Sequence, residues 1–171
     1  MEQIYSPWRM AYLGKVSEKQ GCVFCTALCM EEDSPENLVV YRGERCFIIL
    51  NKYPYASGHA MVVPYLHVQN LEDLNAETQA EMMSAASKAV EVLKLLYKPQ
   101  GFNLGMNIGS AAGAGIAEHL HLHVVPRWVG DSNFVSVVGQ TRVLPETLEQ
   151  SYERFSNAWQ ERFEEGMQSA E

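Results

Sequence analysis

The sequence has no apolar run that approaches membrane-spanning length, and basic residues are in the minority. The 171 residues include 13 Lys and Arg against 21 Asp and Glu, so the formal net charge is −8. This balance argues against a broad nucleic-acid-binding face, which needs clustered basic side chains, but it permits a small anion in a local pocket. We therefore expect neither a nucleic-acid partner nor a membrane partner.

The sequence also lacks internal repeats and low-complexity segments. The N-terminal stretch MEQIYSPWRMAYLGK carries charges and a proline where a signal peptide needs an apolar core, so we expect a cytoplasmic protein. The length and the 47% apolar content suit one domain with a hydrophobic core. We expect a single domain over 1–171, with an irregular N-terminal segment at 1–37 and a C-terminal helix within 145–171.

The apolar pattern changes along the chain between strand-like and helical spacing. Strands are expected at 39–41, 46–50, 59–67, 101–109 and 119–128. Helical spacing covers 73–97 and ends at Pro99 and Gly101. The apolar positions of this helix are Met83, Ala86, Val90, Leu93 and Tyr97.

A second helical stripe occupies the region after Pro145, which fits a first helical turn. Its members are Leu148, Tyr152, Phe155, Trp159 and Phe163. We interpret this stripe as core or as a subunit contact. The order of strands, helix, strands and helix predicts an α+β fold, with an antiparallel sheet of about five strands, a long helix and a C-terminal helix.

Cysteine is scarce, which excludes a dense disulfide framework in a reducing compartment. Two of the four cysteines, Cys22 and Cys25, have the C-x-x-C spacing of a metal knuckle or a redox pair. A thioredoxin-type redox pair would lie in a βαβ unit, and no such unit is visible, so metal is favoured over redox chemistry. The alternative is a pair of buried thiols that pack as small apolar groups.

Histidine is scarce too, yet three of the five histidines lie in AEHLHLHVVPRW. His119, His121 and His123 alternate with apolar residues, so on a strand they share one face. Three imidazoles on one strand face would be three polar groups that need partners, which argues against a purely structural role. Two functions are open: a catalytic metal site, or an imidazole nucleophile that attacks a phosphoryl group and forms a phosphoramidate.

The loop before these histidines favours phosphate chemistry. NIGSAAGAG is rich in small residues, and such a loop exposes backbone N–H groups to oxyanions. Asn107 and Ser110 add side-chain donors.

The pattern HLHLHVV resembles the signature of the histidine triad (HIT) family of nucleotidyl hydrolases and transferases. NKYPYASGHAMVVPYLHV and GFNLGMNIG resemble further family segments, so the resemblance covers roughly residues 5–155. HVVPRWVGDSNF and YSPWRMAYL look like a bacterial branch that includes diadenosine tetraphosphate phosphorylases. GAGIAE replaces the usual glutamine-serine before the triad, which separates this chain from typical purine nucleoside phosphoramidases.

The resemblance implies a role for each matching residue. His121 corresponds to the nucleophile, His123 to a phosphate contact, His119 to a residue that orders the strand, and His59 to a supporting residue. The implied substrate-binding residues are Asn51 at the ribose, Asn107 on the phosphate side, and Ser110, Gly113, Gly115 and Arg127.

The resemblance also implies a structural zinc, since several bacterial family members hold one with a C-x-x-C pair and two histidines. The matching positions are Cys22, Cys25, His67 and His119. Such a closed site weakens the catalytic-metal interpretation. Cys29 and Cys46 are expected to be buried or partly buried packing residues. The family further implies a homodimer.

Together these features predict an enzyme that cleaves dinucleoside polyphosphates, such as diadenosine tetraphosphate, through a nucleotide bound to His121. Phosphate as the acceptor would make it a phosphorylase, and water would make it a hydrolase. The alternatives are a phosphoramidase that acts on AMP with a small leaving group, and a nucleotide-binding signalling module without catalysis.

Overall fold

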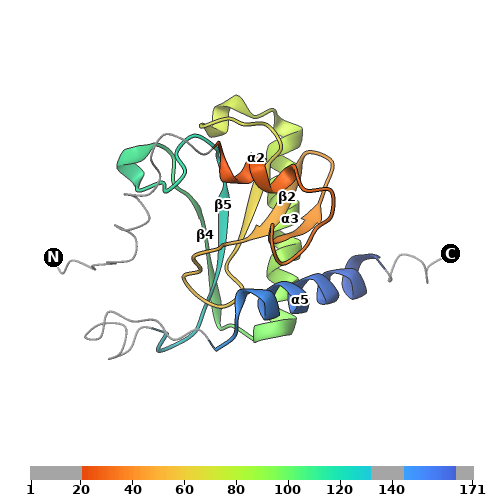
Figure 1. Cartoon of the computed structure of the whole chain (residues 1–171). Helices are drawn as coiled ribbons and strands as arrows, with labels where there is room; N and C mark the ends of the chain where they lie inside the picture. The colour runs from red at the N-terminus through yellow and green to blue at the C-terminus, as the bar shows by residue number, and fades with distance from the viewer. Residues whose placement is uncertain (1–20, 132–144, 165–171) are drawn as a thin grey trace.

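The computed structural model of the chain describes residues 21–131 and 145–164. Its centre is a five-stranded sheet in the order β1-β2-β3-β5-β4, with every neighbouring pair antiparallel. The strands are β1 (Val39–Arg42), β2 (Cys46–Leu50), β3 (Ala60–Pro64), β4 (Gly101–Met106) and β5 (Leu122–Arg127). Two long helices pack on the sheet, α3 (Ala76–Tyr97) and α5 (Leu148–Trp159) (Figure 1). The predicted α+β fold with an antiparallel sheet is confirmed.

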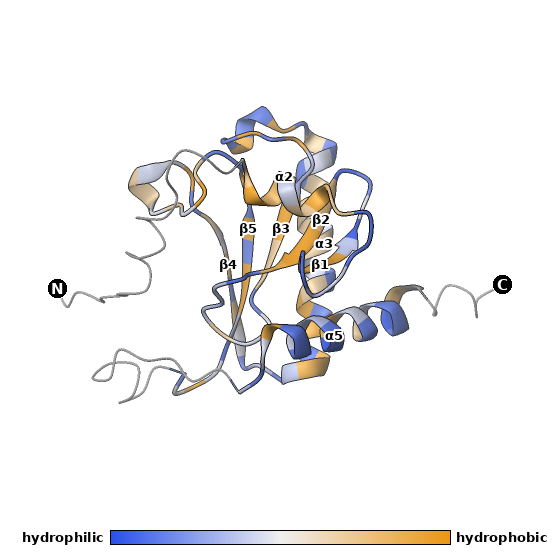
Figure 2. Ribbon diagram, viewed as in Figure 1, coloured by the Kyte–Doolittle hydropathy of each residue, from blue (hydrophilic) through white to orange (hydrophobic). Residues whose placement is uncertain are grey.

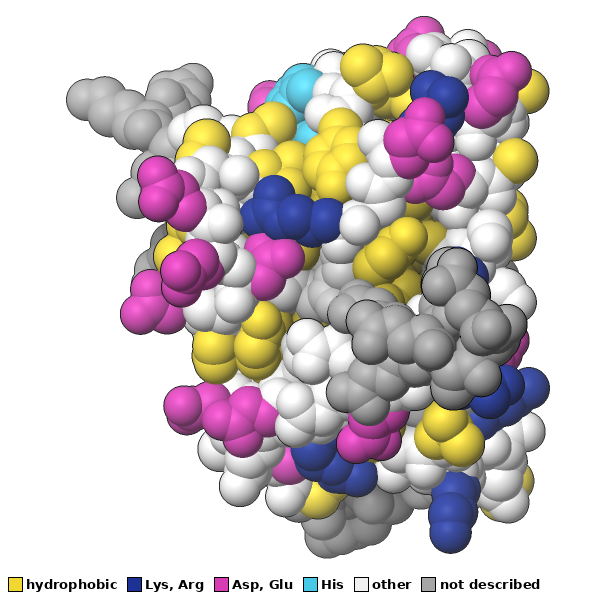
Figure 3. All heavy atoms as spheres, turned by 90° about the vertical axis from the view of Figure 1, so that its right-hand side faces the viewer, with side chains coloured by type: hydrophobic (Ala, Val, Ile, Leu, Met, Phe, Trp, Pro, Cys, Tyr) yellow, Lys and Arg dark blue, Asp and Glu magenta, His cyan; other side chains and the backbone are white. Residues whose placement is uncertain are grey.

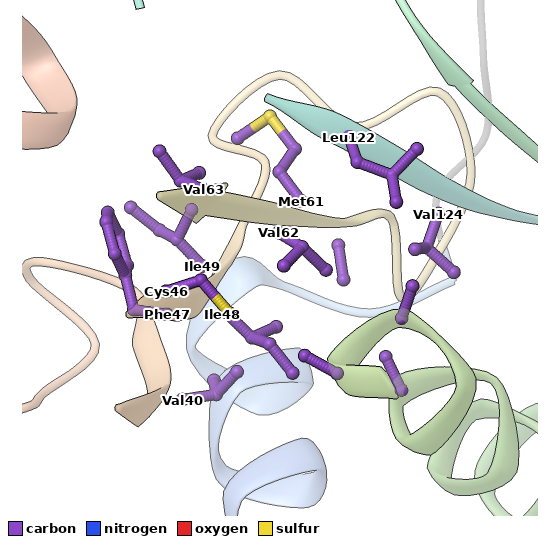
Figure 4. Close-up of a cluster of buried hydrophobic side chains, with 14 of the residues drawn as sticks. Val40, Cys46, Phe47, Ile48, Ile49, Met61, Val62, Val63, Leu122 and Val124 are labelled. Atoms are coloured by element: carbon purple, nitrogen blue, oxygen red, sulfur yellow. The ribbon is translucent and has the colours of Figure 1, made fainter. Parts of the chain in front are cut away.

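Strands β2 and β3 are apolar at every position because both faces of the sheet are covered there. β2 (CFIIL) and β3 (AMVVP) are buried along their whole length, and Figure 2 shows them as hydrophobic ribbons. Figure 4 shows Val62 and Val124 directed toward the helices, while Met61 and Val63 lie on the other side of β3. The second face is the one on which His123 lies, because His123 pairs with Met61.

Helix α3 begins where the Asn75 side chain accepts the backbone N–H of Thr78, and it ends at Tyr97 before Lys98 in the left-handed region. The predicted stripe is partly wrong, because Met83 is 55% exposed and Met82 is buried instead. Both sets of positions satisfy helical spacing. Alanines at 85 and 89 sit on the buried face, and their small side chains allow α3 to approach the sheet closely.

Helix α5 is set by a capping box between Thr147 and Gln150. The sequence suggested that Pro145 lies in the first helical turn. This prediction is wrong, because Pro145 precedes the cap residue Thr147. Phe155 and Trp159 are buried, and the rest of the stripe packs against the same core, so the stripe is core within one chain. A short π-helical turn, Gln160–Glu164, follows.

The segment expected to be irregular before residue 37 contains a helix, α2 (Val23–Leu28). Six residues are too few for a stable isolated helix, so tertiary packing of Phe24 and Ala27 stabilises it. Short connecting turns occur at Leu71–Asp73 and Ser110–Ala112. No described helix is long and apolar enough to cross a membrane.

Candidate functional site

The histidine-rich segment does not lie entirely on a strand. β5 begins at Leu122, so His123 is in the sheet, whereas His119 and His121 precede it. The N–H of Leu120 donates to the carbonyl of Val68 in a loop, which draws this part of the chain out of the strand ladder. The prediction of three histidines on one strand face is therefore wrong. The apolar alternation persists, with the intervening leucines and Val124 buried.

His121 is buried and held by one backbone hydrogen bond. Its Nδ1 lies 2.8 Å from the carbonyl oxygen of His119. Since a carbonyl only accepts, Nδ1 carries the proton and Nε2 keeps its lone pair in the neutral ring. Burial, including contact with the ring of Phe24 at 5.1 Å between centroids, lowers the pKa of His121 below its ordinary value. The ring is thus a neutral imidazole with its nucleophilic nitrogen free of this bond at pH 7.

His123 forms a pair with His59, which directly precedes β3. The Nε2 of His59 lies 2.9 Å from Nδ1 of His123, and the rings of His121 and His123 are 4.8 Å apart. The backbone N–H of Tyr55 donates to Nδ1 of His59 at 3.1 Å. His59 is buried, and the Nδ2 of Asn51 approaches its Nε2 at 3.5 Å. The structure therefore brings Asn51, His59, His121 and His123 together.

The small-residue loop follows β4 directly, with Asn107 half-buried at its start. Gly109 and Gly113 have φ of +78° and +79°, a conformation that favours glycine. The N–H of Gly113 donates to the carbonyl of Ser110 within the turn. Ser110 itself is exposed, and Gly115 is half-buried.

Arg127 lies at the far end of β5, four residues beyond His123, which corresponds to about 13 Å along a strand. Its guanidinium binds the carboxylate of Asp131 at 2.6 Å and the Oδ1 of Asn103 at 2.6 Å. The structure thus does not bring Arg127 to the histidines, and a local ion pair accounts for its position.

A second cluster combines the two cysteines with two histidines. The ligand atoms of Cys22, Cys25, His67 and His119 all lie within 4.8 Å of one another. Sγ of Cys22 is 3.3 Å from Nδ1 of His119, and Sγ of Cys25 is 3.3 Å from Nδ1 of His67. The two separations of 3.3 Å are close to the edge length of a tetrahedron built on metal–ligand bonds of about 2.0–2.3 Å.

The chemistry of this cluster suits a metal. Nε2 of His119 is 2.9 Å from the carbonyl oxygen of Pro64, so it carries the proton and leaves Nδ1 free for a metal. Burial acts to raise the pKa of Cys22, but hydrogen bonds from His119, when Nδ1 of that ring holds a proton that a metal would replace, and from backbone N–H groups lower it to about 6. A thiolate is therefore available near neutral pH. Two thiols and two imidazoles are a ligand set that zinc takes in closed structural sites.

The other two cysteines differ from each other. Cys46 is fully buried, and burial together with the nearby carboxylate of Glu81 raises its pKa to about 12. Cys29 is exposed, which corrects the expectation of a buried or partly buried thiol, and its Sγ donates to the carbonyl of Cys25 one helical turn earlier.

Two residues of the site were missed in the sequence. Phe24 lies between the two cysteines and contacts the rings of both His119 and His121. Tyr55 contacts His59 and His123. The aromatic residues in CVFC and YPYASGH were the available signals, but aromatic side chains are too common in cores to identify a site by themselves.

Comparison with known proteins agrees with this geometry. The family model for the HIT domain matches residues 32–129. AP-4-A phosphorylase of Mycobacterium tuberculosis is 39% identical over 165 residues, which span 93% of this chain and 85% of that protein.

Solved structures give the same picture. A zinc-bound histidine triad family protein from Mycobacterium smegmatis has a TM-score of 0.66 and 29% identity, covering 88% of this chain and 98% of its own. A hypothetical histidine triad nucleotide-binding protein from Sulfolobus tokodaii has a TM-score of 0.64 and 29% identity, covering 82% of this chain and 90% of its own.

Proposed function

The chain belongs to the HIT family, and on that premise we propose that it cleaves dinucleoside polyphosphates through a nucleotide covalently bound to His121. The observation that carries the proposal is the bond between Nδ1 of His121 and the carbonyl of His119, which leaves Nε2 as a nucleophile. The likeness to AP-4-A phosphorylase over most of the chain supports diadenosine tetraphosphate as the substrate.

The reaction has two displacement steps. Nε2 of His121 forms a bond to the α-phosphorus, and the bond from that phosphorus to the bridging oxygen breaks, so that the polyphosphate leaves with the electron pair. The acceptor oxygen then attacks the same phosphorus, and the phosphorus–nitrogen bond breaks and returns its electrons to His121. Phosphate as acceptor gives ADP plus ATP from diadenosine tetraphosphate, and water gives AMP plus ATP.

We assign phosphate as the acceptor, because the relative with 39% identity is a phosphorylase by name. Asn51 would contact the ribose, and His123, Asn107, Ser110 and the loop at Gly113 and Gly115 would surround the phosphates, although the N–H of Gly113 itself is bonded to Ser110. Arg127 has no place in this set, since its guanidinium lies with Asp131 and Asn103.

We further propose that the cluster of Cys22, Cys25, His67 and His119 holds a structural zinc ion. The closeness of the four ligand atoms, which all lie within 4.8 Å of one another, and the zinc-bound relative support this assignment. When bound, zinc supplies a cross-link between α2 and the histidine segment and leaves no open coordination position for catalysis. Reduced thiols of this kind suit a cytoplasmic protein.

A homodimer is proposed as the assembled form. β4 is an edge of the sheet, and Leu104 and Ile108 at this edge are 43% and 41% exposed. An exposed edge with apolar side chains suits pairing with a second copy. Light scattering after size exclusion should give twice the chain mass, and a monomer at micromolar concentration would contradict this proposal.

The surface is consistent with a small-molecule substrate. On the face drawn in Figure 3, acidic and basic side chains of the described residues are interspersed rather than sorted into a basic patch. We propose that the partner of this protein is a nucleotide and not a nucleic acid.

Product analysis tests the function. Purified protein is incubated with diadenosine tetraphosphate, with and without inorganic phosphate, and the nucleotides are separated. ADP plus ATP that depends on phosphate supports the phosphorylase, whereas AMP plus ATP without phosphate identifies a hydrolase. No cleavage overturns the proposal and leaves the phosphoramidase, tested with an AMP amide, or the binding module, tested by nucleotide titration.

A further inference from the structure

Tyr55 contacts both members of the His59–His123 pair. It lies in the loop between β2 and β3, four residues before His59, and is half-buried. Its backbone N–H donates to Nδ1 of His59, and its ring centroid lies 4.5 Å from that of His59 and 5.9 Å from that of His123. The ring is nearly parallel to His123, with 29° between the planes. One residue therefore constrains the pair both through its backbone and through its side chain.

The backbone contact determines where the protons of the pair lie. A peptide N–H can only donate, so Nδ1 of His59 accepts and the proton of the neutral ring is on Nε2. That Nε2–H donates to Nδ1 of His123 at 2.9 Å, and the amide nitrogen of Asn51, which is also a donor and lies 3.5 Å from Nε2, is too far away to compete for this position. His123 in turn carries its own proton on Nε2. Hydrogen bonds are therefore donated in one direction, from the peptide N–H of Tyr55 to His59 and from His59 to His123.

This chain limits what His123 can do. If Nε2 of His123 gave up its proton, Nδ1 would need one from His59, and His59 would need one from the peptide of Tyr55. A peptide N–H does not release a proton at neutral pH, so the chain cannot relay one. His123 is left with the ability to donate a hydrogen bond to developing negative charge.

We propose that Tyr55 is a positioning residue that holds His59 and His123 as a one-way donor chain, so that His123 stabilises a departing phosphate oxygen by a hydrogen bond and does not protonate it. This inference rests on the proposed nucleotidyl transfer. If His123 only donates a hydrogen bond, the site suits leaving groups that are stable as anions, such as a nucleoside polyphosphate. Leaving groups that need a proton, such as alkoxides and amines, gain less from such a donor.

The ring of Tyr55 contributes by orientation. Packed along both imidazoles, it restricts their rotation and keeps Nε2 of His123 aimed away from His59. Donors that are fixed before the reaction stabilise the transition state at no cost of reorganisation, and misplacement by about 1 Å can cost about a hundredfold in rate. The phenol hydroxyl has no part in this role, so phenylalanine should replace tyrosine with little effect.

The first test is nitrogen NMR of the imidazoles in the wild-type protein without substrate. We expect His59 and His123 each to show a protonated Nε2 and an unprotonated Nδ1 at pH 7. A proton on Nδ1 of either ring would overturn the inference. Because this measurement needs neither substrate nor a variant, it separates failure of this inference from failure of the proposed function.

The second test compares Tyr55→Ala with the matched control Tyr55→Phe. We expect Tyr55→Ala to lower kcat for diadenosine tetraphosphate by about tenfold to a hundredfold with KM within about threefold, and Tyr55→Phe to stay near wild type. In Tyr55→Ala, the nitrogen NMR signals of His123 should show a mixture of the two tautomers. Tyr55→Leu replaces Tyr55→Ala if the alanine variant does not fold.

The leaving group provides the decisive comparison. The wild-type protein should transfer AMP from diadenosine tetraphosphate far faster than from an alkyl ester of AMP, and this ratio should shrink in Tyr55→Ala. An unchanged ratio, or equal losses in kcat for Tyr55→Phe and Tyr55→Ala, would overturn the role of the ring. If wild-type protein cleaves no dinucleotide at all, the proposed function fails instead.

Discussion

The Nδ1 of His121 lies 2.8 Å from the backbone carbonyl of His119, and the ring of that same His119 lies 3.3 Å from the thiol of Cys22. The proposed nucleophile and the proposed zinc cluster therefore meet at one residue. Phe24 adds a second link, because it sits between the two cysteines and contacts His121. A metal that fixes His119 also fixes the acceptor that sets the tautomer of His121.

Replacing His121 should remove turnover while sparing nucleotide binding. We expect His121→Ala to lower kcat by at least about a thousandfold, because no other group supplies the nucleophile. Calorimetry with a non-cleavable dinucleotide should give a Kd within a few-fold of wild type. Cys29→Ser is the control, since this thiol is exposed and, among the described residues, bonds to the carbonyl of Cys25 in the adjoining helix. Turnover that survives in His121→Ala would disprove the covalent route.

Loss of the metal ligands should affect both stability and activity. We expect one zinc per chain in wild type and none in a Cys22→Ser, Cys25→Ser double variant, measured by elemental analysis. The variant should lose at least about 3 kcal/mol of unfolding free energy, or roughly 6–12 °C in Tm. Its kcat should fall as well, because His119 is released. If the double variant binds no zinc but keeps full stability and activity, the metal cluster does not support the position of His119.

The pH dependence of stability should report Glu146. Burial acts to raise the pKa of Glu146, but bonds from Tyr97, Ser151 and Arg154 lower it below the ordinary value. A carboxyl with a depressed folded pKa stabilises the fold above its unfolded pKa and loses this contribution as the pH falls through the folded value.

We therefore expect Glu146→Gln to cost about 1–3 kcal/mol at pH 7, measured by urea unfolding. The gap to wild type should close as the pH falls below about 4.5. Glu149→Gln is the matched control. A gap that stays constant from pH 7 to pH 3 would show that charge on Glu146 does not contribute.

Gly58 should tolerate no side chain. Its φ is +73°, and a Cβ would lie 2.6 Å from Leu93 and 2.7 Å from Tyr97. We expect Gly58→Ala to lower the unfolding free energy by about 1–3 kcal/mol and to displace the neighbouring His59. Gly101→Ala is the control, because nothing lies within 4 Å of its Cβ position. Equal stability of the two variants would refute this account of the loop.

Local pattern and chemistry predicted much of the molecule. Strand β2 was predicted with its bounds, the spacing of Cys22 and Cys25 indicated a metal, and the resemblance to the HIT family implied His67 and His119 as the other two ligands. The start of β5 was missed because a bond from Leu120 to Val68 is a tertiary event with no local signal. Helix α2 was missed because it is short and depends on burial of Phe24. The role of Arg127 was misjudged because the turn after β5 brings Asp131 to its guanidinium, and nothing in the local sequence indicated that ion pair.

The central claim is the covalent nucleotide on His121, and rapid quenching tests it most directly. Protein is mixed with diadenosine tetraphosphate without phosphate, quenched in base to preserve a phosphoramidate, digested and analysed by mass spectrometry. The account predicts one adenylyl group on His121, which disappears when phosphate is added and ADP forms. An adduct on another residue, or steady turnover with no adduct at any quench time, would contradict it.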